Sequence, residues 1–243
     1  MRFTSETSSD GVAEQLFTLD EIPAVLWTPE GAPGPRPLIL MGHGGGQHKK
    51  APGVLTRARR FVAECGFAAL AVDVPGHGDR PKDEQYDRIA RENQARVDAG
   101  EDVAPLIAGF HALVARQTVG EWRAVLDAVQ ELDHVGASPV GYWGVSLGCG
   151  LGIPFVAAEP RVRAAAIGLG AALASAKDAA RITVPLEFLM QWDDERIPRA
   201  QGLALFEAFA SAEKTLHANP GKHMDVPGFE MDSTLRFFTR HLG

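Results

Sequence analysis

Apolar and polar residues alternate along this chain with two different periods. Near the N-terminus, residues 15–19 and 22–27 alternate one by one, which predicts an antiparallel hairpin with its turn at Asp20 and Glu21. Farther on, short apolar runs alternate with segments of helical spacing. The apolar runs cover residues 37–41, 67–72, 139–143 and 184–192, followed by a short strand at 214–217. This pattern predicts the α/β class, with a mainly parallel sheet covered by helices on both faces.

One stretch is longer than this alternation requires. Before a helix that contains residues 121–132, a charged helix-forming segment covers 83–99, and a more apolar one covers 102–117. The apolar positions at helical spacing are Ile107, Phe110, Leu113 and Val114. We predict that residues 80–118 form a small helical lid-like insert over a pocket. The alternatives are a longer helix packed on the sheet or a dimer surface, so a homodimer is among the arrangements that the sequence allows.

Composition favours one large globular domain over residues 1–243. With 45% hydrophobic and 23% charged residues, a chain of this length can bury a sizeable core. Cys65 and Cys149 lack metal-ligand spacing and are expected to be free buried thiols. Two basic spots, at 48–50 and 57–60, are expected in a loop and on a solvated helix face.

The charge and the apolar runs also bear on partners and location. A net charge of −7 argues against binding to nucleic acid or to an anionic membrane. Apolar runs stay shorter than a membrane span, and the N-terminal residues lack a signal-peptide core. A cytoplasmic location is the simplest expectation.

A glycine-rich pentapeptide stands where one predicted strand meets a helix. Residues 144–148 read Gly-Val-Ser-Leu-Gly, between the apolar run at 139–143 and a small, apolar segment. A serine on such a turn has a strained backbone and presents its Oγ at the carboxyl end of the strand. Ser146 is therefore a candidate nucleophile. The Leu147 N–H, at a helix N-terminus, is a candidate oxyanion donor. A glycine turn without chemistry is the alternative.

A nucleophilic serine needs a base, and the base needs an orienting acid. In this architecture the acid and then the histidine follow the serine along the chain. The strand at 184–192 ends in carboxylates at 193–195, and His223 lies in a loop after the last strand. Because carboxyl ends of parallel strands open into one crevice, we expect one of these carboxylates and His223 to meet Ser146. Taken singly, Asp194 would be read as a helix N-cap and His223 as a solvated loop histidine.

These segments together resemble the α/β-hydrolase superfamily, and within it the dienelactone-hydrolase-like serine hydrolases and esterases. The matching segments are GHGGG at 42–46, DVPGHG at 73–78, the pentapeptide at 144–148, Asp194 with Ile197 and Pro198, and GKHM at 221–224. The resemblance implies an α/β-hydrolase fold and selects Asp194 as the triad acid. The chain departs from relatives at Gln191, where glycine is common. It also has Ser146 where dienelactone hydrolases use cysteine, which favours ester hydrolysis.

The resemblance implies that the segment at 42–46 supplies a second oxyanion N–H, from Gly44 or Gly45. The alternative is a purely structural glycine turn. The segment is not a phosphate-binding loop, because no Gly-Lys-Ser/Thr ends it, and Gln47 stands where a dinucleotide fingerprint needs its third glycine.

Three residues are candidates for contact with the substrate, namely His43, Phe110 and His111. Glycine-flanked turns explain His43, Asp73 and His77 better than a metal site does. No metal or organic cofactor is expected.

The predicted reaction is hydrolysis of a carboxylic ester of a small to medium molecule, through an acyl-enzyme on Ser146. Thioesters and lactones are close alternatives. The same triad would also serve an acyltransferase or a hydrolase of carbon–carbon bonds. A non-catalytic module that binds a ligand in the same pocket is the remaining alternative, because this scaffold hosts many functions.

Overall fold

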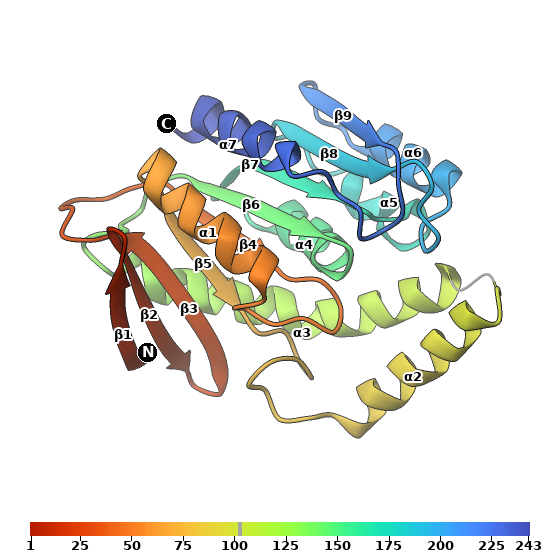
Figure 1. Cartoon of the computed structure of the whole chain (residues 1–243), viewed down its shortest axis with the longest axis horizontal. Helices are drawn as coiled ribbons and strands as arrows, with labels where there is room; N and C mark the ends of the chain where they lie inside the picture. The colour runs from red at the N-terminus through yellow and green to blue at the C-terminus, as the bar shows by residue number, and fades with distance from the viewer. Residues whose placement is uncertain (102–103) are drawn as a thin grey trace.

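Strands from both ends of the chain join one twisted sheet (Figure 1). The computed structural model describes residues 1–101 and 104–243, apart from the side chains of Val97, Ala104, Ile107 and Ala174. Within these residues nine strands follow the order β1-β2-β3-β5-β4-β6-β7-β8-β9. They are β1 (Arg2–Ser9), β2 (Val12–Leu19), β3 (Ile22–Pro29), β4 (Leu38–Gly42), β5 (Ala68–Val72), β6 (Val140–Val145), β7 (Val162–Gly168), β8 (Leu186–Gln191) and β9 (Lys214–Asn219).

The sheet changes character along its width. From β5 to β9 neighbouring strands are parallel, whereas β1, β2 and β3 are antiparallel to their neighbours. The hairpin predicted for residues 15–27 is confirmed as β2 and β3. β1 was not expected from the sequence, because every one of its residues is exposed and the strand carries no apolar alternation.

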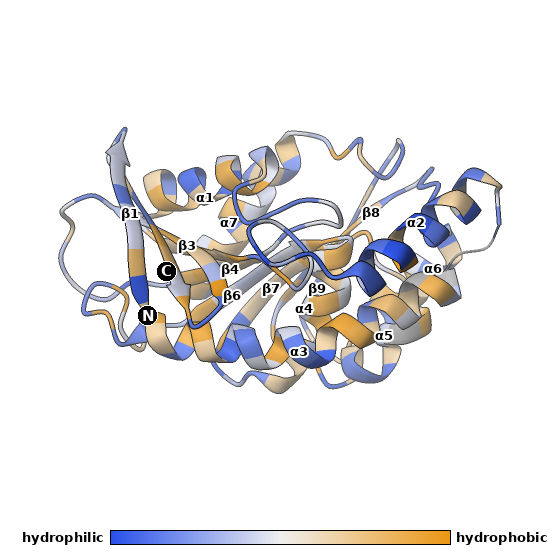
Figure 2. Cartoon of the chain, turned by 90° about the horizontal axis from the view of Figure 1, so that it is seen from below, coloured by the Kyte–Doolittle hydropathy of each residue, from blue (hydrophilic) through white to orange (hydrophobic). Residues whose placement is uncertain are grey.

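Helices cover both faces of the sheet (Figures 1 and 2). α1 and α7 lie on one face, and α3, α4, α5 and α6 pack on the other. Within the described residues the helices are α1 (Pro52–Cys65), α2 (Glu84–Asp98), α3 (Ala104–Gln130), α4 (Leu147–Ala158), α5 (Ala172–Ala179), α6 (Arg199–Ala208) and α7 (Phe229–Leu242). This arrangement is the α/β-hydrolase fold that the sequence predicts. None of these helices combines the length and the apolarity needed to cross a membrane.

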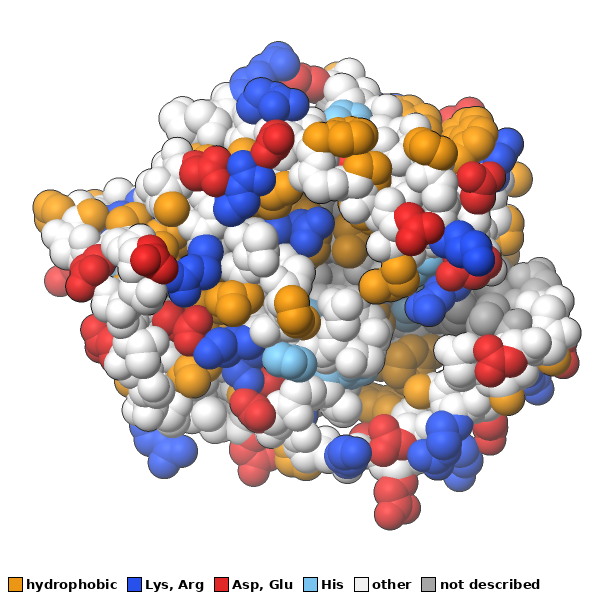
Figure 3. Space-filling model, viewed as in Figure 1, with side chains coloured by type: hydrophobic (Ala, Val, Ile, Leu, Met, Phe, Trp, Pro, Cys, Tyr) orange, Lys and Arg blue, Asp and Glu red, His pale blue; other side chains and the backbone are white. Residues whose placement is uncertain are grey.

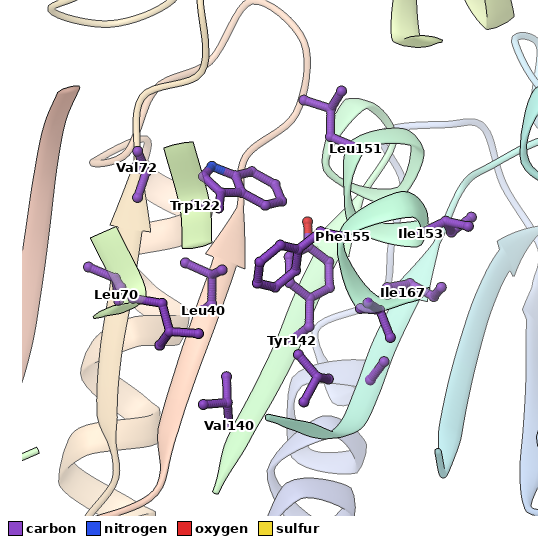
Figure 4. Close-up of a cluster of buried hydrophobic side chains, with 14 of the residues drawn as sticks. Leu40, Leu70, Val72, Trp122, Val140, Tyr142, Leu151, Ile153, Phe155 and Ile167 are labelled. Carbon is purple, nitrogen blue, oxygen red and sulfur yellow. The ribbon is translucent and has the colours of Figure 1, made fainter. Parts of the chain in front are cut away.

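Burial on both faces explains why the central strands are continuous apolar runs. In β4, Leu38 and Leu40 face one apolar cluster, while Ile39 and Met41 face the other. Figure 4 shows the first cluster, where Trp122 of α3 meets aromatic rings from β6 and α4. The ring centroids of Trp122, Tyr142 and Phe155 lie 5.4–5.8 Å apart. Such pairs contribute about 0.5–1.5 kcal/mol beyond the burial of their area.

α3 is longer than the sequence suggested. The separate helices expected at 102–117 and 121–132 form one helix that ends at Gln130, and residues 102 and 103 lie outside the described residues. Thr118, Val119 and Gly120, which lie between the two expected helices, have low helix propensity. The Thr118 hydroxyl instead donates a hydrogen bond to the Val114 carbonyl at 2.9 Å and is buried, so packing overrides propensity here.

Candidate active site

The strand-to-helix turn places Ser146 at the carboxyl end of β6. Its φ of 57° and ψ of −118° are strained for a non-glycine residue. Close approach of neighbouring backbone explains the flanking glycines: a Cβ at Gly144 would lie 2.7 Å from the Gly148 carbonyl oxygen. The Tyr142 hydroxyl donates to that same oxygen at 2.6 Å and fixes the first turn of α4. The serine is therefore held out from the sheet by backbone packing on both sides.

Ser146, His223 and Asp194 form a continuous chain of contacts. His223 Nε2 lies 2.9 Å from Ser146 Oγ, and His223 Nδ1 lies 2.7 Å from Asp194 Oδ2. The histidine and aspartate side chains are only 3% and 2% exposed, so water competes little for these contacts. The residues come from the ends of β6, β8 and β9, as the crevice argument expects.

Asp194 has a second task besides facing His223. Its Oδ1 accepts the N–H groups of Arg196 at 2.8 Å and Ile197 at 2.9 Å. Burial alone would raise the pKa of the Asp194 carboxyl. The hydrogen bond and charge of His223, together with the two N–H donors, outweigh burial and hold that pKa below its ordinary value. Asp194 Oδ1 therefore closes a local turn. The reading of Asp194 as a helix N-cap is wrong, because α6 begins at Arg199 with Pro198 as its N-cap and no side-chain capping bond.

The two neighbours of Asp194 point elsewhere. Asp193 is exposed; its Oδ2 accepts the Gly221 N–H at 3.3 Å, and its Oδ1 lies 3.8 Å from Arg199. Glu195 accepts the backbone N–H of His223 at 2.9 Å. The sequence offered Glu195 only as one of the three carboxylates that could face His223, and it gave no signal for a contact with the His223 backbone. The structure places it as a clamp on the histidine loop.

A pocket of about 610 Å³ opens beside Ser146. Its walls include Leu147, Leu169 and Ile197 from the sheet side, and Tyr86 and Phe110 from α2 and α3. In the space-filling view the surface is hollowed between these two helices and the body (Figure 3). The insert predicted at 80–118 thus borders the same pocket as Ser146.

Comparison with known proteins places the chain in a family. Neither a protein-family model nor a curated protein matches it. A solved structure of a cold-adapted esterase from an Arctic intertidal metagenomic library is 30% identical, with a TM-score of 0.80 and 100% of both chains covered. This chain belongs to the α/β-hydrolase superfamily. Within that superfamily it is similar to this esterase, and its fold is also that of a dienelactone hydrolase.

More distant α/β-hydrolases share the fold. The acetyl xylan esterase of a Paenibacillus species is 17% identical, with a TM-score of 0.73, covering 99% of this chain and 88% of that one. The dienelactone hydrolase of Anabaena variabilis is 20% identical, with a TM-score of 0.64, covering 98% and 99%.

The α/β-hydrolase pocket separates the two oxyanion candidates on the glycine loop. Gly45 lines the pocket together with Leu147, whereas Gly44 is not among the lining residues. A Cβ built on Gly45 would stand 3.9 Å from the Leu147 Cβ, so the two residues are neighbours at the pocket wall. Gly44 instead accepts the Gln47 N–H through its carbonyl at 3.2 Å, closing a turn.

The residues expected to contact the substrate also differ in whether they line the pocket. Phe110 and His111 line the pocket, and burial lowers the pKa of His111 to about 4. Leu113, expected beside them, is 39% exposed and does not line it. The Ile107 side chain lies outside the described residues.

The prediction that His43 contacts the substrate is not supported, because the residue lies outside the pocket. Its ring is buried under the glycine loop, outside the pocket lining. Nδ1 lies 2.9 Å from the Gly44 carbonyl oxygen, and Nε2 accepts the Val74 N–H at 3.3 Å. Burial lowers the pKa of His43 to about 4, so the ring stays neutral and suits this donor–acceptor pair. The ring holds backbone rather than substrate.

Of the three residues that the sequence places in glycine-flanked turns rather than in a metal site, His43, Asp73 and His77, Asp73 has polar partners of its own. Asp73 accepts hydrogen bonds from Lys49 and from the Asp79 N–H. No group of three potential ligands gathers anywhere in the described part of the chain. Lys49 lies in a loop, as expected for residues 48–50, but the residue is buried, with only 4% exposed.

Proposed function

We propose that this α/β-hydrolase is a serine esterase that cleaves a carboxylic ester of a small to medium molecule through an acyl-enzyme on Ser146. The observation that carries the proposal is the Asp194–His223–Ser146 contact chain of 2.7 and 2.9 Å, opening into the pocket. The esterase relative with 30% identity supports the same class of reaction.

In the proposed first half-reaction, Ser146 Oγ attacks the ester carbonyl carbon while His223 Nε2 takes its proton. The π-electron pair moves to the carbonyl oxygen, and the N–H groups of Leu147 and Gly45 stabilise this oxyanion. Asp194 keeps the Nδ1 proton of His223 in place and stabilises the imidazolium. The intermediate collapses when His223 gives its proton to the leaving alkoxide.

In the second half-reaction, His223 accepts a proton from water, whose oxygen attacks the acyl carbon. A second oxyanion forms in the same place, and its collapse returns the proton to Ser146 and releases the carboxylic acid. Atoms balance without a metal or an organic cofactor, because water supplies the oxygen that the acid gains.

The pocket supports a small-molecule substrate. A volume of about 610 Å³ lies in the range usual for small-molecule sites. Residues from α2 and α3 form one side of it, so we propose that the segment 80–118 acts as a lid that selects the substrate. Solved neighbours include an acetyl xylan esterase and an esterase with ferulic acid bound. Short aliphatic and aromatic acyl esters are therefore the first substrates to assay.

Labelling with a fluorophosphonate tests the nucleophile. The wild-type protein should be labelled at Ser146. Ser146→Ala should not be labelled, and its esterase activity should fall by several orders of magnitude. Ser175, a buried serine that also lines the pocket, is the matched control, and Ser175→Ala should still be labelled. A Ser146→Ala protein that keeps more than about a tenth of the activity would refute the proposal.

A substrate panel tests the reaction class. p-Nitrophenyl esters of increasing chain length are compared with thioesters and lactones of matched size. The proposal expects the highest kcat/KM for an oxygen ester. A clear preference for thioesters or lactones would reassign the substrate while leaving the role of Ser146 intact.

A further inference from the structure

The glycine loop after β4 is built from two consecutive turns. The first spans Gly44 to Gln47, closed by the Gln47 N–H on the Gly44 carbonyl at 3.2 Å, with Gly46 at a φ of 69°. The positive φ at the third position is typical of a type II turn. The second is closed by the Ala51 N–H on the His48 carbonyl at 2.9 Å. The first turn carries Gly45, the proposed oxyanion donor. This turn lies outside the helices and strands, so other contacts must fix its position.

Lys49 fastens the second turn to the loop that follows β5. Its backbone N–H donates to Asp73 Oδ1 at 2.7 Å, and its Nζ donates to Asp73 Oδ2 at 2.6 Å. The same ammonium reaches Asp79 Oδ2 at 2.6 Å. The side chains of Lys49 and Asp73 are 5% and 0% exposed, so this pair is withdrawn from water.

The loop at 73–79 is wrapped around the Asp73 carboxylate. The Asp79 N–H donates to Asp73 Oδ2 at 2.9 Å. Gly78 has a φ of 58°, and a Cβ there would collide with that carboxylate. Asp73 is thus a fixed point, and Lys49 ties the glycine loop to it.

The other flank of the Gly44–Gln47 turn is tied to the same loop by His43, whose Nε2 accepts the Val74 N–H at 3.3 Å. Both ends of the donor turn are therefore anchored on one support, by a neutral ring before it and an ammonium group after it. Gly45 and Gly46 lie between the anchors and line the pocket.

We propose that Lys49 is a positioning residue of the oxyanion hole, which fixes the Gly45 N–H by clamping its turn to Asp73. The inference rests on the proposed function, since it presupposes an oxyanion formed at Ser146. A buried ion pair is weak support for stability by itself, and in some proteins its role is to fix one geometry. Oxyanion donors need such fixation, because their contribution depends on distances of about 3 Å to the developing charge.

Lys50 provides a matched control. It is the next residue in the same turn and also forms an ion pair, from its Nζ to Glu14 Oε1 at 2.5 Å. That pair links the turn to β2, away from the pocket, and the Lys50 side chain is 34% exposed. Lys49→Met and Lys50→Met therefore remove the same chemistry from adjacent positions, and only the first touches the support of the donor turn.

The test separates oxyanion binding from substrate binding. Ser146 Oγ attacks the carbonyl carbon of an aliphatic trifluoromethyl ketone and forms a covalent adduct. The serine proton goes to His223, and the carbonyl oxygen becomes an oxyanion. The matching methyl ketone occupies the same pocket without forming a stable adduct. We expect Lys49→Met to lower kcat by about 10- to 100-fold with KM nearly unchanged. The inhibition constant of the trifluoromethyl ketone should rise by the same factor, and that of the methyl ketone should not change.

Other outcomes decide against the proposal. A loss of kcat without weaker trifluoromethyl ketone binding, equal losses for both ketones, or no difference from Lys50→Met would each overturn it. If Lys49→Met does not fold, Lys49→Gln, which keeps a hydrogen-bond donor, is measured instead. Its fall in kcat should again equal the rise in the inhibition constant of the trifluoromethyl ketone. Absence of esterase activity and of Ser146 labelling in the wild type would refute the proposed function itself, a result distinct from these.

Discussion

Histidines of one chain acquire different roles from the atoms around them. His43 and His223 are both nearly fully buried. His223 has a carboxylate on one nitrogen and a hydroxyl on the other, the arrangement needed to accept and return a proton. His43 has backbone groups on both nitrogens, so charging its ring would remove a hydrogen bond and gain no partner. Burial and partners, rather than residue type, therefore separate a base from a loop anchor.

This difference predicts a pH effect on stability. The pKa of His43 is about 4 in the folded protein, against an ordinary value of 6.5. Between these values the unfolded chain binds more protons than the folded one, so stability falls as pH falls through that window. Urea unfolding at several pH values should give a steeper fall for wild type than for His43→Gln, by up to about 1.4 kcal/mol per pH unit. His48→Gln, at an exposed position of the same loop, should follow the wild type. Parallel curves for wild type and His43→Gln would show that His43 is not the group responsible.

The adjacent aspartates after β8 allow a second comparison of single residues. Asp194→Asn should cost orders of magnitude in kcat, because an amide cannot hold the His223 proton in the same way. Asp193→Asn should stay near wild-type activity, since its carboxylate contacts Gly221 and Arg199 at the surface. Steady-state kinetics on one ester suffices. Equal losses of kcat in both variants would mean that the substitutions act by disturbing the turn after β8, and not by removing a triad acid.

At the scale of elements, α3 joins two parts of the molecule. Its C-terminal half packs Trp122 into the core beneath β6, and its N-terminal half carries Phe110 and His111 to the pocket. Because one rigid helix does both, the position of the proposed lid is tied to the core. Gly150 of α4 shows how closely the two helices meet, since a Cβ there would collide with the His111 ring.

Two positions on α3 test the lid. Phe110 lines the pocket and packs edge-on against Tyr86, with centroids 5.7 Å apart. Phe110→Ala should enlarge the pocket and shift the preferred p-nitrophenyl ester toward longer acyl chains, with only a modest fall in melting temperature. Leu113→Ala, on the exposed side of the same helix, should leave the chain-length profile unchanged. A Phe110→Ala profile that matches the wild type would place specificity in the loops around Gly45 and Gly170 instead.

At the scale of the whole molecule, the sequence predicted what depends on local pattern. Continuous apolar runs marked the central strands, and the order of Ser146, Asp194 and His223 marked the carboxyl edge of the sheet. What it missed depends on partners distant along the chain. The sequence places Lys49 in a basic loop but does not indicate its buried partner Asp73. It offers His43 as a substrate contact, because the Val74 N–H that the ring accepts is distant along the chain. Apart from Phe3, β1 is polar, and its pairing with β2 defines it.

That last strand supports a prediction about the molecule as a whole. β1 buries no residue and pairs only with β2, at the opposite edge of the sheet from β8 and β9. A chain that lacks residues 1–9 should therefore keep kcat/KM within about twofold, because the pocket and triad rest on the parallel strands. Its melting temperature should fall slightly, since β2 becomes an edge strand. Size-exclusion chromatography should give the same oligomeric state for both chains. If shortening changes that state, and activity falls with it, β1 is the contact of a homodimer on which the site depends.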